Sequence, residues 1–87
     1  MTNLEWLILD EVYLMADYQT VSNAVGENAL LFDGALVGLL QKGWIRQMTF
    51  DEVVKDYTDV DPFDATRLAE AHYVITKQGL LEHTGAA

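Results

Sequence analysis

The chain has 87 residues with 14 Asp and Glu against 5 Lys and Arg, and its formal charge at pH 7 is −9. This length allows one domain with a thin core, because so short a chain buries only about 60–65% of its unfolded surface. Hydrophobic residues make up 51% of the chain, too many for a disordered acidic tail, and there is no cysteine. The composition excludes disulfides and thiolate chemistry, and the negative charge disfavours nucleic acid as a partner.

A helix is expected from about Asn3 to Ala16, because Thr2 and Glu5 form the capping-box pattern that starts a helix. Acidic residues interrupt its apolar run, which is too short to cross a bilayer, so neither a signal peptide nor a membrane contact is expected and the cytoplasm is the default location. The helix is apolar nearly all round, a pattern typical of burial on more than one side. One of its apolar stripes consists of Trp6, Leu9 and Tyr13.

Two more helices are predicted before the middle of the chain. A short helix is expected over residues 19–25 with Gly26 at its end, and a longer one over 28–42 with Gly43 at its end. Glycine is favoured there because it adopts the left-handed backbone conformation that closes many helices. The outer side of the longer helix is expected to carry Leu30, Asp33, Gly34, Val37, Gly38 and Gln41.

The second half of the chain combines strand and helix signals. Residues 44–48 alternate as strand residues do, and residues 73–76 form the clearest strand. Between them, apolar residues at positions 50, 53, 54 and 57 follow a second capping-box pair, so a helix is expected over 50–57. Another helix start is predicted at 61–64, and residues 84–87 are expected to fray.

Three phrases along the chain resemble those of winged helix-turn-helix regulators of the PadR-like and MarR-like families, and the first of them, Ile8-Leu9-Asp10, is similar to their opening helix. Residues 36–45 (LVGLLQKGWI) resemble the junction of the third helix with the first wing strand, and residues 73–80 (YVITKQGL) resemble the closing wing strand. The resemblance implies a small α+β winged-helix-like domain over residues 1–87. It would consist of three N-terminal helices and a short antiparallel β-hairpin wing. Residues 47–71 separate the two expected wing strands of this chain and are therefore expected to form a helical insertion, a departure from the short wing of the family. The resemblance also implies DNA binding through the third helix and the wing.

The residues at the surface that would bind DNA are mostly not the basic and polar residues that DNA binding requires. The expected third helix offers no base on its outer side before Lys42, and the insertion at 47–71 holds seven acids against two bases. The sequence therefore predicts a non-enzymatic protein-interaction or regulatory module that keeps the scaffold. The alternative is a DNA-binding transcription regulator of this class. Its phosphate contacts would be Gln41, Lys42, Arg46, Lys55 and Lys77.

Two surfaces are candidates for binding a protein partner or a second copy, and the charge favours a basic partner surface. Gly34 and Gly38 form a G-x-x-x-G strip, which either the preceding helix of the chain or a partner helix approaches closely. The stripe on the first helix is either an interface or is covered by the segment 50–57. The candidate interface residues are Trp6, Leu9, Tyr13, Leu30, Gly34, Val37 and Gly38.

No residue pattern predicts catalysis, a cofactor or a metal. The acids from Asp59 to Glu70 depart from the EF-hand pattern, because Asp64 occupies the glycine position. His72 and His83 lack the spacing of metal ligands, and no P-loop, dinucleotide-binding or nucleophile motif occurs. We therefore expect no catalytic, cofactor-binding or metal-ligating residues.

Overall fold

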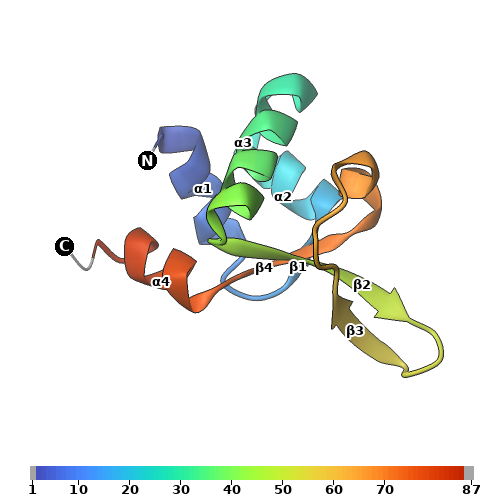
Figure 1. Ribbon diagram of the computed structural model, residues 1–87. Helices are drawn as coiled ribbons and strands as arrows, with labels where there is room; N and C mark the ends of the chain where they lie inside the picture. The colour runs from blue at the N-terminus through green and yellow to red at the C-terminus, as the bar shows by residue number, and fades with distance from the viewer. Residues whose placement is uncertain (1, 86–87) are drawn as a thin grey trace.

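The first half of the chain is helical, as predicted, and the second half adds most of the strands (Figure 1). The computed structural model describes residues 2–85. Its first elements are α1 (Asn3–Glu11), β1 (Ala16–Asp17), α2 (Tyr18–Val25) and α3 (Ala29–Lys42). The elements that follow are β2 (Ile45–Asp51), β3 (Asp56–Asp59), the 3₁₀ helix η1 (Ala65–Glu70), β4 (His72–Ile75) and α4 (Lys77–His83). The expected α+β class is confirmed, and the layout is consistent with a winged-helix-like domain.

The ends of α2 and α3 follow local signals in the sequence. Gly26 and Gly43 close these helices with φ angles of 72° and 74°, in the left-handed region that favours glycine. The side chain of Asn28 caps α3 by accepting a hydrogen bond from the backbone N–H of Leu31 at 3.0 Å. The helices predicted over 19–25 and 28–42 are therefore confirmed.

Helix α1 begins as predicted but ends at Glu11 rather than near Ala16. The Thr2 hydroxyl accepts a hydrogen bond from the backbone N–H of Glu5 at 3.2 Å, which completes the capping box. After the helix, the Val12 carbonyl accepts a hydrogen bond from the N–H of Ile75 at 2.8 Å. The predicted end was wrong because this pairing draws the chain out of the helix and along β4.

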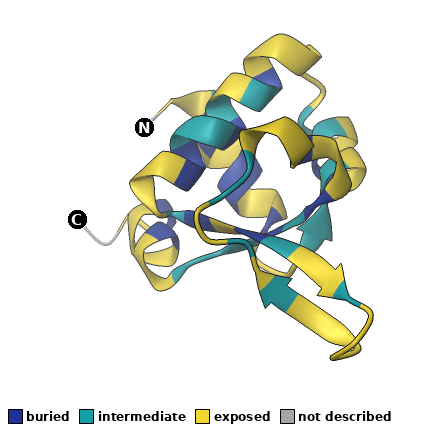
Figure 2. Ribbon diagram, turned by 45° about the vertical axis from the view of Figure 1, so that its right-hand side comes forward, coloured by how far each residue is buried: buried dark blue, intermediate teal, exposed yellow. Residues whose placement is uncertain are grey.

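The sheet has the strand order β1-β4-β2-β3, and each neighbouring pair is antiparallel. Its inner face lies against the helices and buries Ile45, Gln47 and Tyr73. The β2–β3 hairpin extends beyond the helices (Figure 1), and its surface is mostly exposed (Figure 2). No helix of the described residues 2–85 packs on the outer face of the sheet in these views.

The helix predicted over 50–57 was wrong, because these residues form the hairpin. The Asp51 carboxylate accepts hydrogen bonds from the N–H groups of Val53 and Val54 at 2.8 and 3.2 Å, which favours a turn after β2. Phe50 and Tyr57 then lie opposite each other across the two strands. A spacing of seven residues suits one face of a helix, but it also suits two partners across a four-residue turn.

The expected insertion at 47–71 therefore contains a strand hairpin as well as a short helix. The helix start predicted at 61–64 is confirmed, because the Asp64 carboxylate accepts a hydrogen bond from the N–H of Thr66 at 2.9 Å and caps η1. This helix is of the 3₁₀ type, and Arg67 interrupts it with non-helical angles (φ −125°, ψ 32°).

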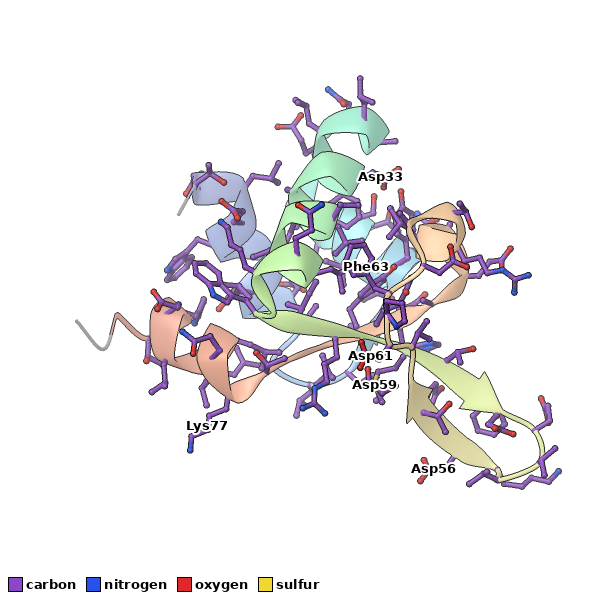
Figure 3. All side chains as sticks on the ribbon, viewed as in Figure 1. Asp33, Asp56, Asp59, Asp61, Phe63 and Lys77 are labelled. Atoms are coloured by element: carbon purple, nitrogen blue, oxygen red, sulfur yellow. The ribbon has the colours of Figure 1, made fainter. Side chains whose placement is uncertain are left out.

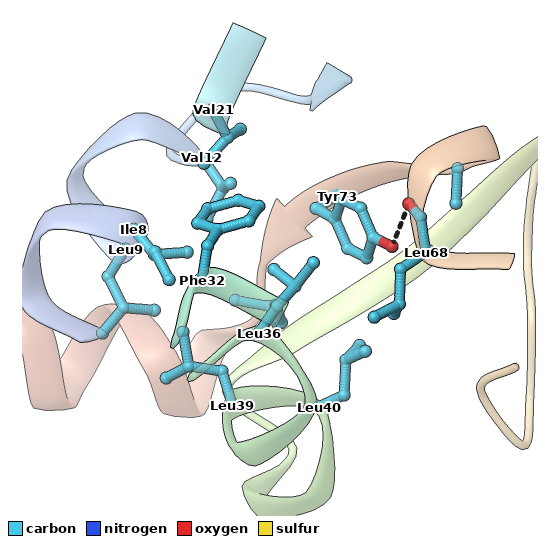
Figure 4. Close-up of a cluster of buried hydrophobic side chains, with 12 residues drawn as sticks. Ile8, Leu9, Val12, Val21, Phe32, Leu36, Leu39, Leu40, Leu68 and Tyr73 are labelled. Atoms are coloured by element: carbon cyan, nitrogen blue, oxygen red, sulfur yellow. Dashed lines mark hydrogen bonds between the residues drawn. The ribbon is translucent and has the colours of Figure 1, made fainter. Parts of the chain in front are cut away.

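The core lies between α1, α3 and the inner face of the sheet (Figure 4). Tyr73 is fully buried at its centre and donates a hydrogen bond from its hydroxyl to the Leu68 carbonyl at 2.7 Å. Leu9 is also fully buried, so its placement in an interface was wrong. The buried apolar residues are Ile8, Leu9, Val12, Val21, Phe32, Leu36, Leu39, Leu40, Ile45, Leu68, Ala71 and Tyr73.

Helix α4 was not predicted. The strand expected over 73–76 ends at Ile75, and the Thr76 hydroxyl caps α4 by accepting a hydrogen bond from the N–H of Gly79 at 3.0 Å. The helix packs against α1 and β4. Thr84 and Gly85 form a turn after it, whereas Ala86 and Ala87, also in the segment expected to fray, lie outside the described residues.

Candidate functional site

The outer side of α3 is open along the strip formed by Leu30, Gly34 and Gly38. These residues are spaced by four and lie along one side of the helix. A Cβ atom added to either glycine would have nothing within 4 Å beyond its own helix and chain neighbours. The alternative in which α2 crosses this strip is therefore wrong. Within the described residues, nothing else approaches these two glycines.

Large apolar side chains lie beside the glycines. Leu30 is 84% exposed and Leu31 is 54% exposed. Val37, by contrast, is partly buried and packs against the core, so it contributes less to the strip than expected. The exposure of Leu31 was not predicted, because an apolar residue in the first turn of a helix does not by itself show whether its side chain faces the core or the solvent.

Asp33 does not present a free carboxylate on this side of α3. It accepts a hydrogen bond from the Tyr18 hydroxyl at 2.7 Å. This hydrogen bond, with a smaller contribution from burial, raises the pKa of Tyr18 to about 12. Asp33, which was expected on the outer side of this helix, is instead part of the contact between α2 and α3, and the strip formed by Leu30, Gly34 and Gly38 carries no charge.

The stripe on α1 contacts α4 rather than the hairpin. Trp6 stacks on His83 with ring centroids 4.5 Å apart, and the Tyr13 hydroxyl oxygen lies 2.7 Å from Nδ1 of His83. Trp6 and Tyr13 remain 43% and 39% exposed. The alternative in which residues 50–57 cover this stripe is therefore wrong, and α4 takes that position.

His83 is buried between these two rings. Among residues 2–85, its Nε2 atom has no hydrogen-bond partner, and it lies 3.7 Å from Oδ1 of Asp10. The residues next to His83 in the sequence do not predict that its ring is buried, because this burial depends on where α4 packs against α1.

The basic residues proposed as phosphate contacts are dispersed. Lys42 pairs with Glu5, and Lys55 lies in the exposed hairpin turn. Only Arg46 and Lys77 share a location, a surface groove of about 430 Å³. Asp59 and Asp61 line the same groove, and Figure 3 labels them together with Lys77. Gln41 is exposed on α3, away from that groove.

The Lys42–Glu5 pair joins the start of α1 to the end of α3. Nζ of Lys42 lies 2.5 Å from Oε2 of Glu5, and it also lies 4.6 Å from the ring centroid of Trp44. Burial opposes ionisation of Glu5, but hydrogen bonds from Lys42 and Thr2 outweigh it and hold the pKa of Glu5 below its usual 4.5. Lys42 is thereby committed to a contact within the chain.

We expect Glu5→Gln to lower the free energy of unfolding at pH 7 by about 1 kcal/mol, because the variant loses the ion pair with Lys42. The pKa of Glu5 is lower in the folded state, so its stabilising contribution is present above pH 4.5 and lost as the pH falls through the folded-state value. Urea denaturation at pH 7 and pH 3 should show a difference between Glu5→Gln and the wild type that is smaller at the lower pH. Glu52→Gln removes the same charge from the exposed hairpin turn and should change stability at pH 7 by less than about 0.5 kcal/mol. Equal effects of the two variants at pH 7 would contradict the role given to Glu5.

Two searches of the described residues bear on other kinds of site. No helix among residues 2–85 combines the length and apolar character needed to cross a bilayer. In the same part of the chain, no three His, Asp or Glu side chains are grouped closely enough to hold a metal ion.

Comparison with known proteins gives no relative. No protein-family model matches the chain, and neither a curated protein nor a solved structure matches it significantly.

Proposed function

We propose that this protein is a cytoplasmic, non-enzymatic interaction module with a winged-helix-like scaffold. Its α3 face binds a helix of a basic protein partner. The observation that carries the proposal is the open strip on α3, where Gly34 and Gly38 have free space beside them and Leu30 is 84% exposed. Each glycine costs about 1 kcal/mol relative to alanine inside a helix. A partner helix that packs closely against the strip supplies a reason for that cost.

Charge supports a partner of opposite sign rather than a second copy. The chain carries a net charge of −9, so two copies repel each other, whereas a basic protein is attracted. The strip itself is uncharged, which lets apolar contacts form there without desolvating a carboxylate. Attraction from the net negative charge of the chain would act mainly on the rate of association and on the choice of partner.

Duplex DNA is the less favoured partner. Lys42 is paired with Glu5, and the groove that contains Arg46 and Lys77 also contains two aspartates. Phosphate binding requires bases that are free and gathered on one face. In a mobility-shift titration at low salt we expect no binding, and tight, salt-sensitive binding would replace our proposal with the transcription-regulator alternative.

The α3 face can be tested with Leu30→Asp and the matched control Leu14→Asp. The two leucines are 84% and 83% exposed, but Leu14 lies in the connection from α1 to β1. Both variants should fold, since neither side chain is buried. We expect the immobilised wild-type protein to retain a basic protein from host extract. Leu30→Asp should weaken the Kd for that purified partner at least about tenfold, and Leu14→Asp should leave it nearly unchanged.

Two outcomes would contradict this proposal. Equal binding by both variants would show that the partner uses another surface. A wild-type dimer in sedimentation velocity that Leu30→Asp dissociates would identify a second copy, rather than a basic protein, as the occupant of the strip.

A further inference from the structure

The outer face of the sheet carries a continuous aromatic surface. Side chains alternate along a strand, so burial of Gln47 and Tyr73 on the inner face places Met48 and His72 on the outer one. Phe50 and Tyr57 lie on this outer face too, opposite each other in the hairpin. Phe50 is 44% exposed and Tyr57 is 36% exposed, so solvent reaches the rings.

Contacts between the rings make this surface one unit. The centroids of Phe50 and Tyr57 are 5.3 Å apart, with their planes at 77°. The centroids of Tyr57 and His72 are 4.8 Å apart, with their planes at 59°. The Tyr57 side chain of β3 therefore reaches across β2, beside Met48, and contacts His72 of β4. Such contacts favour this arrangement of the rings, and part of Phe50 and of Tyr57 stays open to solvent.

Carboxylates lie at both ends of this surface. The register of the sheet aligns Asp17, His72, Met48 and Asp59 in one row across its four strands. Among residues 2–85, neither Asp17 nor Asp59 forms an ion pair. Asp17 accepts a hydrogen bond from the Thr20 hydroxyl, which with the nearby His72 holds the pKa of Asp17 below its usual range. Arg46 also lies on this face, two residues before Met48, and it lines the same groove as Asp59.

We propose that the aromatic surface of Met48, Phe50, Tyr57 and His72, with Asp59 and Asp17 at its ends, binds an arginine side chain of a basic partner. The negative face of an aromatic ring attracts a cation, and a neighbouring carboxylate adds a charge-assisted hydrogen bond. Arginine fits better than lysine, because its planar guanidinium stacks on a ring while its N–H groups bind a carboxylate. The choice of a basic partner rests on the proposed function, but the site can bind a short peptide without α3.

The probe for this site is the peptide acetyl-Gly-Arg-Gly-Arg-Gly-amide, with a peptide containing neutral citrulline in place of arginine as its control. Titration of the ¹⁵N-labelled protein should shift the amide signals of Phe50, Tyr57 and His72 most strongly. The citrulline peptide should bind at least about threefold more weakly, because it has the same shape without the charge.

Asp59→Asn and Asp56→Asn form a matched pair of variants. Both residues are exposed and lie on β3, but Asp56 is on the opposite face of the strand, by alternation. Asparagine at position 56 still offers an acceptor for the N–H of Tyr57, which Asp56 binds at 2.8 Å. We expect Asp59→Asn to weaken peptide binding about threefold and Asp56→Asn to weaken it less than about 1.5-fold. Tyr57→Val, which keeps a strand-forming residue but removes the ring, should weaken binding about fivefold.

The inference fails if Asp56→Asn and Asp59→Asn weaken binding equally, or if the citrulline peptide binds as well as the arginine peptide. Either result would mean that the peptide responds only to net charge or to shape. If Tyr57→Val does not fold, the two aspartate variants and the citrulline control still test whether the surface binds arginine. Leu30→Asp should bind the peptide as the wild type does, so failure at this site and failure of the α3 proposal are distinguishable.

Discussion

Replacing Gly79 by alanine is expected to lower the free energy of unfolding by about 2–3 kcal/mol. A Cβ atom at this position would lie 2.0 Å from the carbonyl oxygen of Trp44 and 2.9 Å from Cγ1 of Ile75. The Trp44 carbonyl cannot easily move, because it accepts a hydrogen bond from the N–H of Thr76 at 2.9 Å. Helix α4 would therefore have to shift away from the start of β2, and its contacts with α1 would weaken.

Urea denaturation measures this loss, and Gly34→Ala provides the matched control. Gly34 is also inside a helix, but nothing lies near the Cβ that alanine would add. Alanine there should raise the free energy of unfolding by about 0.5–1 kcal/mol, since glycine costs more backbone entropy on folding. Stabilisation by both substitutions would show that α4 does not dock as closely as the structure has it.

Replacing Gln47 by leucine is expected to cost about 2–3 kcal/mol of unfolding free energy. Gln47 is 1% exposed, and its amide group makes two hydrogen bonds with the backbone of Asp64. Its Nε2 donates to the Asp64 carbonyl at 3.0 Å, and its Oε1 accepts from the Asp64 N–H at 2.6 Å. Leucine has a similar volume but no polar atoms, so both backbone groups would lose their partner beneath η1.

Two comparisons show whether Gln47→Leu acts through its lost hydrogen bonds to Asp64 or through a general effect on the fold. Gln41→Leu makes the same substitution at an exposed position of α3 and should change unfolding by less than about 0.5 kcal/mol. Amide hydrogen exchange should accelerate most at residues 64–71, where the connection before η1 is released, and less in α3. Uniform acceleration throughout the chain would contradict a local role of Gln47.

The predictions from the sequence succeeded where neighbouring residues decide the structure. The capping box at Thr2, the cap at Asn28 and the left-handed glycines after α2 and α3 each act within one turn of backbone. The same reach explains why the start of η1 was found at Asp64. These local signals placed α2, α3 and the start of α1 correctly, and the α+β class was also correct.

The errors occurred where one local pattern is compatible with two structures. Phe50 and Tyr57 are seven residues apart, which places them on one side of a helix or opposite each other in a hairpin. The turn at Asp51 and the pairing of β3 with β2 select the hairpin. Leu9 was expected in an interface because α1 has several apolar stripes, and only its neighbours determine which of them is buried.

Local backbone signals were therefore enough for the starts of α1, α3 and η1 and for the glycine-closed ends of α2 and α3, because these depend on adjacent residues. Composition alone gave the net charge of −9. The early end of α1, the docking of α4 upon His83, the open strip at Gly34 and Gly38, and the aromatic face of the sheet came only from the folded chain. Each depends on residues far apart in sequence, such as Val12 with Ile75 or Tyr57 with His72. Contacts of that kind are set by the packing of the whole core, and no short segment contains the information that selects them.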